Sequence, residues 1–230
     1  DDNYPLVYSK NNTVSEGLKP LLVITYRNQN GLESYLNYKT QSFTDGNTFL
    51  NTYNGNLVGV FNIGGTVSSK LPASVNLIYN TNDAVLKNNG FKFSLNQTVR
   101  VSSIDDYEYL EHEDEDGTLH YFYKDDDNGK YNDEDGLSLT IEKNDNCCYM
   151  TDKYGNKKTF MKSSNDIYYL TKIEDISLNS INITLDSNNR ITRITDGNNL
   201  PISIEYLSNQ TIVTSPDRAV TLNYNGKHYC

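Results

Sequence analysis

The sequence predicts an all-β protein in which antiparallel hairpins follow one another and helix is scarce. The main observation is a repeat: Leu170–Asp175 recurs as Ile191–Asp196, and Ile181–Leu185 recurs as Ile202–Tyr206, each at an offset of 21 residues. A short fixed period marks a unit that buries its apolar face only by stacking on its neighbours. The composition agrees, because 19 Tyr and 7 Phe with only 36% hydrophobic residues suit half-buried strands. Clusters of Asn, which tolerates left-handed backbone, mark the turns.

The acidic balance of the chain limits its partners. The formal net charge is −10 and the pI is near 4.7. Nucleic acid and anionic membranes are bound through clustered Lys and Arg, so neither is expected as a partner. No apolar run reaches the length of a membrane span, and Asp1-Asp2-Asn3 is not a charged-then-apolar leader.

Three cysteines are too few for a disulfide framework. Cys147 and Cys148 are adjacent, and neighbouring cysteines rarely bridge one another. Free thiols are therefore favoured over a bridge from this pair to Cys230.

Strand candidates in the first half of the chain are short and bounded by Pro, Gly and Asn. Leu21–Tyr26 is one such run, whereas Leu32–Tyr38 is a strand candidate that fits neither the helical nor the strand period cleanly. Turns are predicted at Tyr53–Gly55 and Gly64-Gly65. The runs between and after these turns predict strands at Asn56–Phe61, Ala73–Tyr79, Phe91–Leu95 and Val99–Val101.

An acidic, Tyr-rich insert follows at residues 102 to 136. Asp116-Gly117 lies between two alternating runs, which predicts a hairpin. Tyr121 and Tyr123 share one face of the second run, with Phe122 on the other. Leu137–Ile141 then predicts a strand. Hairpin units continue with Tyr149–Phe160, the two aligned copies and a shortened unit at Asp217–Tyr224.

Two sets of residues resemble the RHS/YD-repeat family. Before the repeats, the order of an Asn-Gly turn, a Leu-Pro pair, a Tyr-Asn step and a Gly-Phe pair is similar to that family's pattern, although Phe93 stands where the family has Trp. In the repeats, the family's Tyr-Asp-x-x-Gly-Arg turn corresponds to Leu185, Asp186, Asn189 and Arg190, with Asn replacing Gly. The remaining landmarks of the repeat are Asp175, Asp196 and Tyr206, although the turn pattern after Tyr206 is lost.

The resemblance implies a fold, a location and partners. The hairpins would stack into a curled, shell-like sheet of a secreted or surface-exposed bacterial protein of the toxin-associated type. The function would be structural, encapsulation or cell-surface interaction, without catalysis and without a cofactor. We expect about ten strands, with at least one sheet edge that pairs with further repeats of the same polypeptide. A cell-surface glycan or protein is a further partner on this interpretation.

Three segments are predicted along the chain. Residues 1–50 form an irregular N-terminal segment with some strand, 51–148 a pre-repeat β region that contains the acidic hairpin, and 149–230 the YD-like hairpins.

The acidic runs contain four calcium candidates, because hard cations take oxygen ligands: Asp125, Asp127, Asp133 and Asp135. Their spacing fails the EF-hand template, since position one would fall on Lys124 or Tyr131. A solvated hairpin tip is therefore the favoured interpretation.

No catalytic or zinc-binding pattern is present in the sequence. The histidines are His112, His120 and His228, and none has zinc spacing. His112 and His120 flank the predicted turn and are candidates to face each other across the hairpin, but surface histidines are favoured over a metal pair. No Gly-x-Ser-x-Gly and no phosphate-binding Gly-rich loop occurs. Acidic pairs carry no information, because so many Asp and Glu are available by chance.

Tyrosines near the predicted hairpins support an alternative function, a carbohydrate-binding β module. The candidates for stacking on a sugar are Tyr107, Tyr109, Tyr121 and Tyr123. Packing between strands is the favoured role for these side chains, because cross-strand aromatic pairs stabilise sheets.

Overall fold

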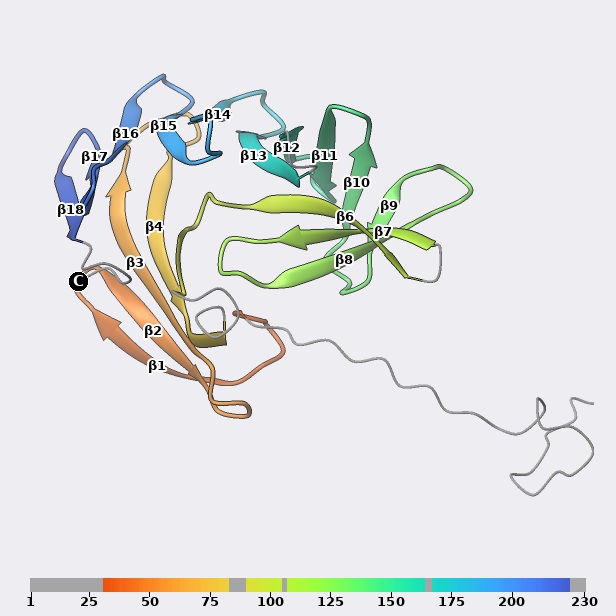
Figure 1. Ribbon diagram of the computed structural model, residues 1–230, viewed down its shortest axis with the longest axis horizontal. Helices are drawn as coiled ribbons and strands as arrows, with labels where there is room; N and C mark the ends of the chain where they lie inside the picture. Colours follow the sequence, from red (N-terminus) through yellow and green to blue (C-terminus); the bar gives the residue numbers. More distant parts are fainter. Residues whose placement is uncertain (1–30, 83–89, 105–106, 164–166, 224–230) are drawn as a thin grey trace, which may run out of the picture.

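The computed structural model describes residues 31–82, 90–104, 107–163 and 167–223, and their regular structure is almost entirely β-strand (Figure 1). Eighteen strands form two sheets whose neighbouring strands run antiparallel. The all-β prediction is confirmed, although the described residues hold more strands than the ten or so that were expected. The strand candidate Leu21–Tyr26 lies outside the described residues.

The first sheet has five strands in chain order. They are β1 (Tyr38–Phe43), β2 (Gly46–Asn51), β3 (Leu57–Gly65), β4 (Ser74–Asn80) and β5 (Phe91–Phe93). In β4, Val75 and Leu77 alternate into the core, as the sequence pattern predicts.

Eight strands of the second sheet close on themselves as a barrel. These are β6 (Thr98–Ile104), β7 (Tyr107–Glu113), β8 (Leu119–Lys124), β9 (Tyr131–Asp133), β10 (Leu139–Lys143), β11 (Cys147–Asp152), β12 (Lys157–Lys162) and β13 (Ile167–Glu174). Each strand pairs with the next in the chain, and β13 returns to pair with β6. The predicted hairpins at Asp116-Gly117 and within Tyr149–Phe160 are both formed, as β7–β8 and β11–β12.

Strand β13 joins the barrel to the rest of the sheet. One edge pairs with β12 along its length. The other edge is shared, because Ile167–Tyr169 pair with β6 whereas Lys172–Glu174 pair with β14 (Ser180–Leu185). A register shift opposite Thr159/Phe160 lies between these two parts. Bulges bend a strand and increase its twist, which suits the place where the sheet leaves the barrel.

From β13 the chain continues as a ladder of hairpins, which we call the ladder and define as strands β14 to β18. After β14 come β15 (Ile191–Thr195), β16 (Pro201–Tyr206), β17 (Gln210–Thr214) and β18 (Ala219–Asn223). Its buried face is aliphatic: Ile181, Ile183, Ile191, Ile194, Ile202, Ile204 and Val213. The 21-residue period thus corresponds to two strands and their turns.

One turn type closes five of the hairpins. It runs over five residues beginning at Asp114, Asp152, Asp175, Asp186 and Asp196. In each, the Asp N–H donates to the carbonyl four residues later, and its Oδ1 accepts the backbone N–H groups two and four residues later. The fourth residue has a positive φ: Gly117 94°, Gly155 92°, Leu178 65°, Asn189 61° and Asn199 64°. Gly and Asn at this position therefore have a backbone reason.

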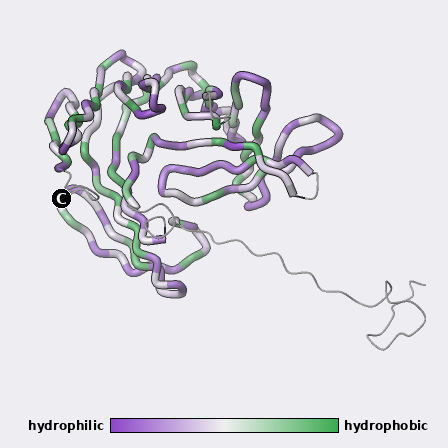
Figure 2. The backbone as a smooth tube through the Cα atoms, viewed as in Figure 1, coloured by the Kyte–Doolittle hydropathy of each residue, from purple (hydrophilic) through white to green (hydrophobic). Residues whose placement is uncertain are grey.

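The first sheet packs against the ladder, and one continuous core joins the two sheets (Figures 1 and 2). The hydrophilic colour in Figure 2 collects at the outer hairpin tips, above all beyond β8. Strand β3 lies next to β17 and β18. A Cβ on Gly64 would lie 3.4 Å from side-chain atoms of Val213 and of Ser215, which shows how closely β3 approaches the ladder.

Two local predictions are wrong for the same reason, that tertiary contacts decide them. Residues 32 to 37 form a turn rather than a strand, and the Leu32 N–H donates to the Asp116 side chain at 2.8 Å. Gly64-Gly65 do not form a turn, because β3 runs through them with a register shift at Asn62/Gly64. The sheets also divide the chain between residues 93 and 98, whereas the sequence segments divide it at 50 and 148.

Candidate functional site

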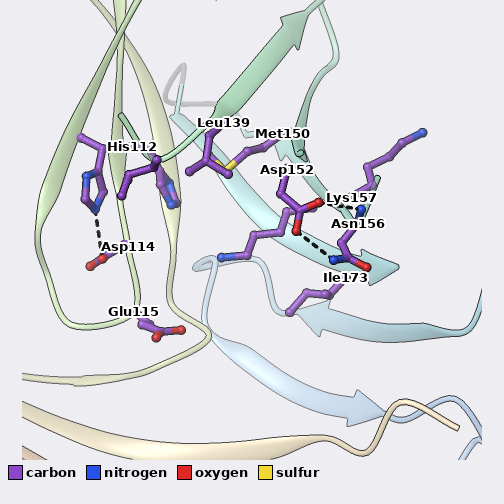
Figure 3. A pocket seen from close by; sticks show the side chains of 12 residues that line it. His112, Asp114, Glu115, Leu139, Met150, Asp152, Asn156, Lys157 and Ile173 are labelled. Atoms are coloured by element: carbon purple, nitrogen blue, oxygen red, sulfur yellow. Dashed lines mark hydrogen bonds and ion pairs between the residues drawn. The ribbon is translucent and has the colours of Figure 1, made fainter. Parts of the chain in front are cut away.

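A cavity of about 300 Å³ opens at one end of the barrel, which we call the barrel mouth (Figure 3). The turns β7–β8 and β11–β12 and the connection β9–β10 all lie at this end. Side chains that line it include His112, Asp114, His120, Met150, Lys158 and Ile173. A volume of this size is at the lower limit of small-molecule sites.

The two histidines reach the mouth because the hairpin β7–β8 pairs them directly. His112 is the cross-strand partner of His120, and their ring centroids are 6.1 Å apart. Leu110 and Phe122 lie on the same inward face, one pair deeper in the barrel, and both are fully buried. The prediction that these histidines are surface residues is wrong, since His112 is 2% and His120 5% exposed. His228 lies outside the described residues.

His120 is held as a cation between two carboxylates. Its Nε2 donates to Asp114 Oδ2 at 3.1 Å and its Nδ1 to Asp135 Oδ2 at 3.0 Å. Burial by itself lowers the pKa of His120, but the hydrogen bonds with Asp114 and Asp135 outweigh it and raise the pKa to about 9. Burial likewise raises the pKa of Asp114, yet the bond to His120 brings it to about 2.

His112 is neutral although it stacks on that cation. Its Nδ1 donates to the Thr98 carbonyl at 3.0 Å, and its ring edge meets Phe160 at a centroid distance of 5.5 Å. Burial, with the charge of Lys158 as the second cause, lowers the pKa of His112 to about 3. The remaining nitrogen, Nε2, is then an acceptor, and it has no hydrogen-bond partner within the described residues.

A second layer of carboxylates fixes the β7–β8 turn. Asp116 accepts from Leu32 N–H at 2.8 Å and from Thr118 Oγ1 at 2.7 Å, and burial together with the charge of Asp114 raises its pKa to about 6. Glu33 is 6% exposed. Burial raises the pKa of Glu33 above its usual value. The charge of His120 lowers this pKa in part, and the neighbouring carboxylates raise it again. Residues 31 to 33 thereby attach the first sheet to the barrel.

Lys158 provides the amine of the barrel mouth. It pairs with Met150 of β11 and Ile173 of β13, which also line the cavity, so its side chain points to the same side. Its Nζ donates to Gln97 Oε1 at 2.9 Å, and Gln97 is itself held by a bond from its Nε2 to the Ser94 carbonyl at 3.1 Å. Burial lowers the pKa of Lys158.

The barrel mouth therefore combines groups whose pKa values are shifted in different directions by their surroundings. A cationic His120, a neutral His112 and an amine with a lowered pKa lie at one cavity, and such a combination is typical of sites that bind or transform ligands. Sequence reasoning missed Lys158 and the carboxylates of the turn, because only barrel closure brings β6, β7, β8, β11, β12 and β13 together. The His112/His120 symmetry about Asp116-Gly117 was the available signal.

The four calcium candidates do not converge. Asp125 caps the exposed β8–β9 turn, accepting from the N–H of Asp127 at 3.0 Å, and Asp133 accepts from the N–H groups of Leu137 and Leu139. Asp135 is bonded to His120. Among the described residues no group of three or more His, Cys, Asp or Glu side chains is arranged to hold a metal ion.

Three of the four candidate tyrosines pack on one another. The ring of Tyr109, 8% exposed, stacks on Tyr123 at 5.7 Å and lies 6.0 Å from Tyr121. Tyr107 is 77% exposed and stands apart from this contact. The arrangement is a cross-strand cluster on the outer face of β7 and β8 rather than an open row of rings.

The motif residues of the repeat lie in the ladder and its turns. Asp175, Asp186 and Asp196 each begin one of the five-residue turns, and Asn189, which stands where the family has Gly, has a left-handed φ. Arg190 bonds to Asp186 and lies over the Tyr206 ring, 4.4 Å from its centroid. Leu185 is half-buried at the end of β14.

Cys147 and Cys148 are buried free thiols, and burial raises the pKa of Cys148 to about 12. Cys230 lies outside the described residues.

The sequence matches no protein-family model, and no curated protein is similar to it. In the part of the chain that the structure describes, no helix has the length and apolar character to cross a bilayer.

Proposed function

We propose that this chain is a non-catalytic structural part of a secreted or surface bacterial protein of the RHS/YD-repeat type, and that its ladder is the beginning of a longer sheet. The observation that carries the proposal is the regular extension from β13: strands of one period, joined by Asp-led turns, with one aliphatic face. Each strand of the ladder pairs with the edge of the strand before it, and repeat proteins likewise grow by adding units to their neighbours. Encapsulation or cell-surface interaction is the role that such a sheet would serve.

The edge strand β18 supports this proposal. It pairs with β17, and no strand among the described residues pairs with its other edge. Ser215 donates to the Arg218 carbonyl at 2.8 Å and closes the β17–β18 turn. Because hydrogen-bonded and non-bonded pairs alternate along an antiparallel ladder, the backbone N–H groups of Ala219, Thr221 and Asn223 face the free edge. An edge of this kind is a template for another strand.

The experiment extends the chain after Asn223 by one further copy of residues 191–211. Docking of the added hairpin would slow amide hydrogen exchange at Thr221, by about tenfold or more, because this N–H would enter a ladder bond. A Thr221→Pro variant of the extended chain is the control, since it removes the outward donor and leaves the bonds to β17 intact. Unchanged exchange at Thr221 in the extended chain would contradict the proposal.

The carbohydrate-binding alternative finds less support. Three of its four candidate tyrosines are half-buried or buried in mutual contact, so their faces are occupied. Binding of the chain to a glycan array, abolished in the double variant Tyr107→Ala and Tyr123→Ala, would support the carbohydrate-binding alternative.

A further inference from the structure

The barrel mouth holds a lysine whose environment does not suit a permanent charge. Lys158 has no ion pair among the described residues, and its amine donates to a neutral amide oxygen, that of Gln97. Apolar side chains of Leu139, Met150 and Ile173 form the wall beside it. Burial lowers the pKa of Lys158, and a lowered pKa increases the share of the neutral, nucleophilic amine.

A hydrogen-bond acceptor lines the same cavity. His112 is oriented by its Nδ1–H bond to Thr98, which leaves the Nε2 lone pair available to a ligand. Because burial keeps His112 neutral, this nitrogen suits a hydrogen bond from a ligand hydroxyl rather than the uptake of a proton.

The charges at the rim select among ligands. Asp114, Glu115 and Asp152 line the cavity together with the cations His120 and Lys157, so beside a neutral Lys158 amine the lining carries no net positive charge that would attract an anion. The cavity of about 300 Å³ admits a small molecule, and its apolar wall favours a short hydrocarbon body. No Tyr or Phe ring lines it among the described residues, which disfavours a sugar.

We propose that the barrel mouth binds a small neutral aldehyde or ketone, and that the Lys158 amine forms an imine with its carbonyl carbon. This site is separate from the ladder and goes beyond the structural role proposed above. The amine lone pair forms the C–N bond while the carbonyl π electrons move to oxygen. A proton passes from the nitrogen to this oxygen through water and gives a carbinolamine, whose hydroxyl then leaves as water with the second proton of the nitrogen. One amine and one carbonyl give one imine and one water, so no oxidant or reductant is required.

The experiment traps the imine in the intact chain. The protein is incubated with butanal and cyanoborohydride at pH 7, and the reduced adducts are located by peptide mass spectrometry. Lys153 is the internal control, because it lies in the exposed β11–β12 turn, with its Nζ 5.1 Å from the centroid of the Tyr154 ring, and is not among the residues that line the cavity. We expect Lys158 to be labelled about tenfold faster than Lys153, with a rate that saturates as butanal increases.

Three results would overturn the proposal. Equal labelling of Lys158 and Lys153 would show that Lys158 has no special reactivity, and a labelling rate strictly linear in butanal concentration would show that no binding step precedes the reaction. Labelling by the anion pyruvate as fast as by butanal would contradict the selection of neutral ligands. Lys158→Arg, which keeps a cation but no nucleophilic amine, is expected to abolish the saturable adduct. The labelling map of the unmodified chain decides the question even where that variant fails to fold.

Discussion

The barrel and the ladder belong to one sheet, yet their interiors differ in kind. The ladder buries isoleucines and a valine, and its turns repeat one Asp-led pattern. The barrel buries Leu110 and Phe122 at its middle but His112, His120 and Gln97 toward its mouth. A dry aliphatic face needs only a neighbour to cover it, whereas buried polar groups need specific partners at fixed distances. The difference indicates that the ladder is built for extension and the barrel mouth for a defined constellation.

The largest expected effect is the loss of the buried cation. His120→Leu would leave Asp114 and Asp135 without their shared partner, and we expect the free energy of unfolding at pH 7 to fall by about 3–5 kcal/mol. Urea unfolding followed by circular dichroism measures it. Adding Asp114→Asn and Asp135→Asn to the same chain should restore part of the loss. A triple variant as unstable as His120→Leu would show that the loss comes from packing and not from charge.

A substitution in the ladder should lower the free energy of unfolding by less, and this loss should not depend on pH. Ile194 is fully buried, and Ile194→Ala removes three carbons and leaves a cavity. We expect a loss of about 3 kcal/mol in the same urea experiment. The loss should be equal at pH 6.5 and pH 9.5, because no titratable group takes part. A clear pH dependence of this difference would mean that the two interiors are coupled.

The stability of the barrel should fall as the pH rises. The pKa of His120 is raised from 6.5 to about 9, so its contribution is fully present below pH 6.5 and is lost as the pH rises through 9. We expect roughly 2 to 3 kcal/mol between these limits. The lowered pKa of Lys158 acts in the opposite direction, so the test is the difference between the unmodified chain and His120→Gln across the range. A constant difference would contradict the charge state assigned to His120.

The smallest expected effect concerns one turn of the repeat. Leu178 has φ 65°, a conformation that costs a branched side chain about 1 kcal/mol, and its side chain is 77% exposed. Leu178→Gly is therefore expected to stabilise the protein by roughly 0.5–1 kcal/mol, which a thermal unfolding curve detects. Gly155→Leu, at the same place in the β11–β12 turn, is the reciprocal control and should destabilise. If Leu178→Gly left the thermal unfolding curve unchanged, the turn would carry no strain at Leu178.

The sequence determined the features that depend on neighbours along the chain. Alternation placed Val75 and Leu77 on one face, the 21-residue period located the ladder, and Asp116-Gly117 located a hairpin whose ends bring His112 and His120 opposite each other. It also pointed to left-handed backbone at Asn189. All of these follow from local geometry, in which a residue's face and its turn conformation are set within a few positions.

Only the tertiary structure decided what closes and what is buried. The pairing of β13 with β6 joins residues about 70 positions apart, and no local pattern encodes that pairing. The β9–β10 connection brings Asp135 to His120, which with Asp114 makes an expected surface residue a buried cation, and barrel closure places Lys158 at the same cavity as His112. Burial and charge at the mouth arise from contacts between distant segments, and these contacts set the pKa values that define the site.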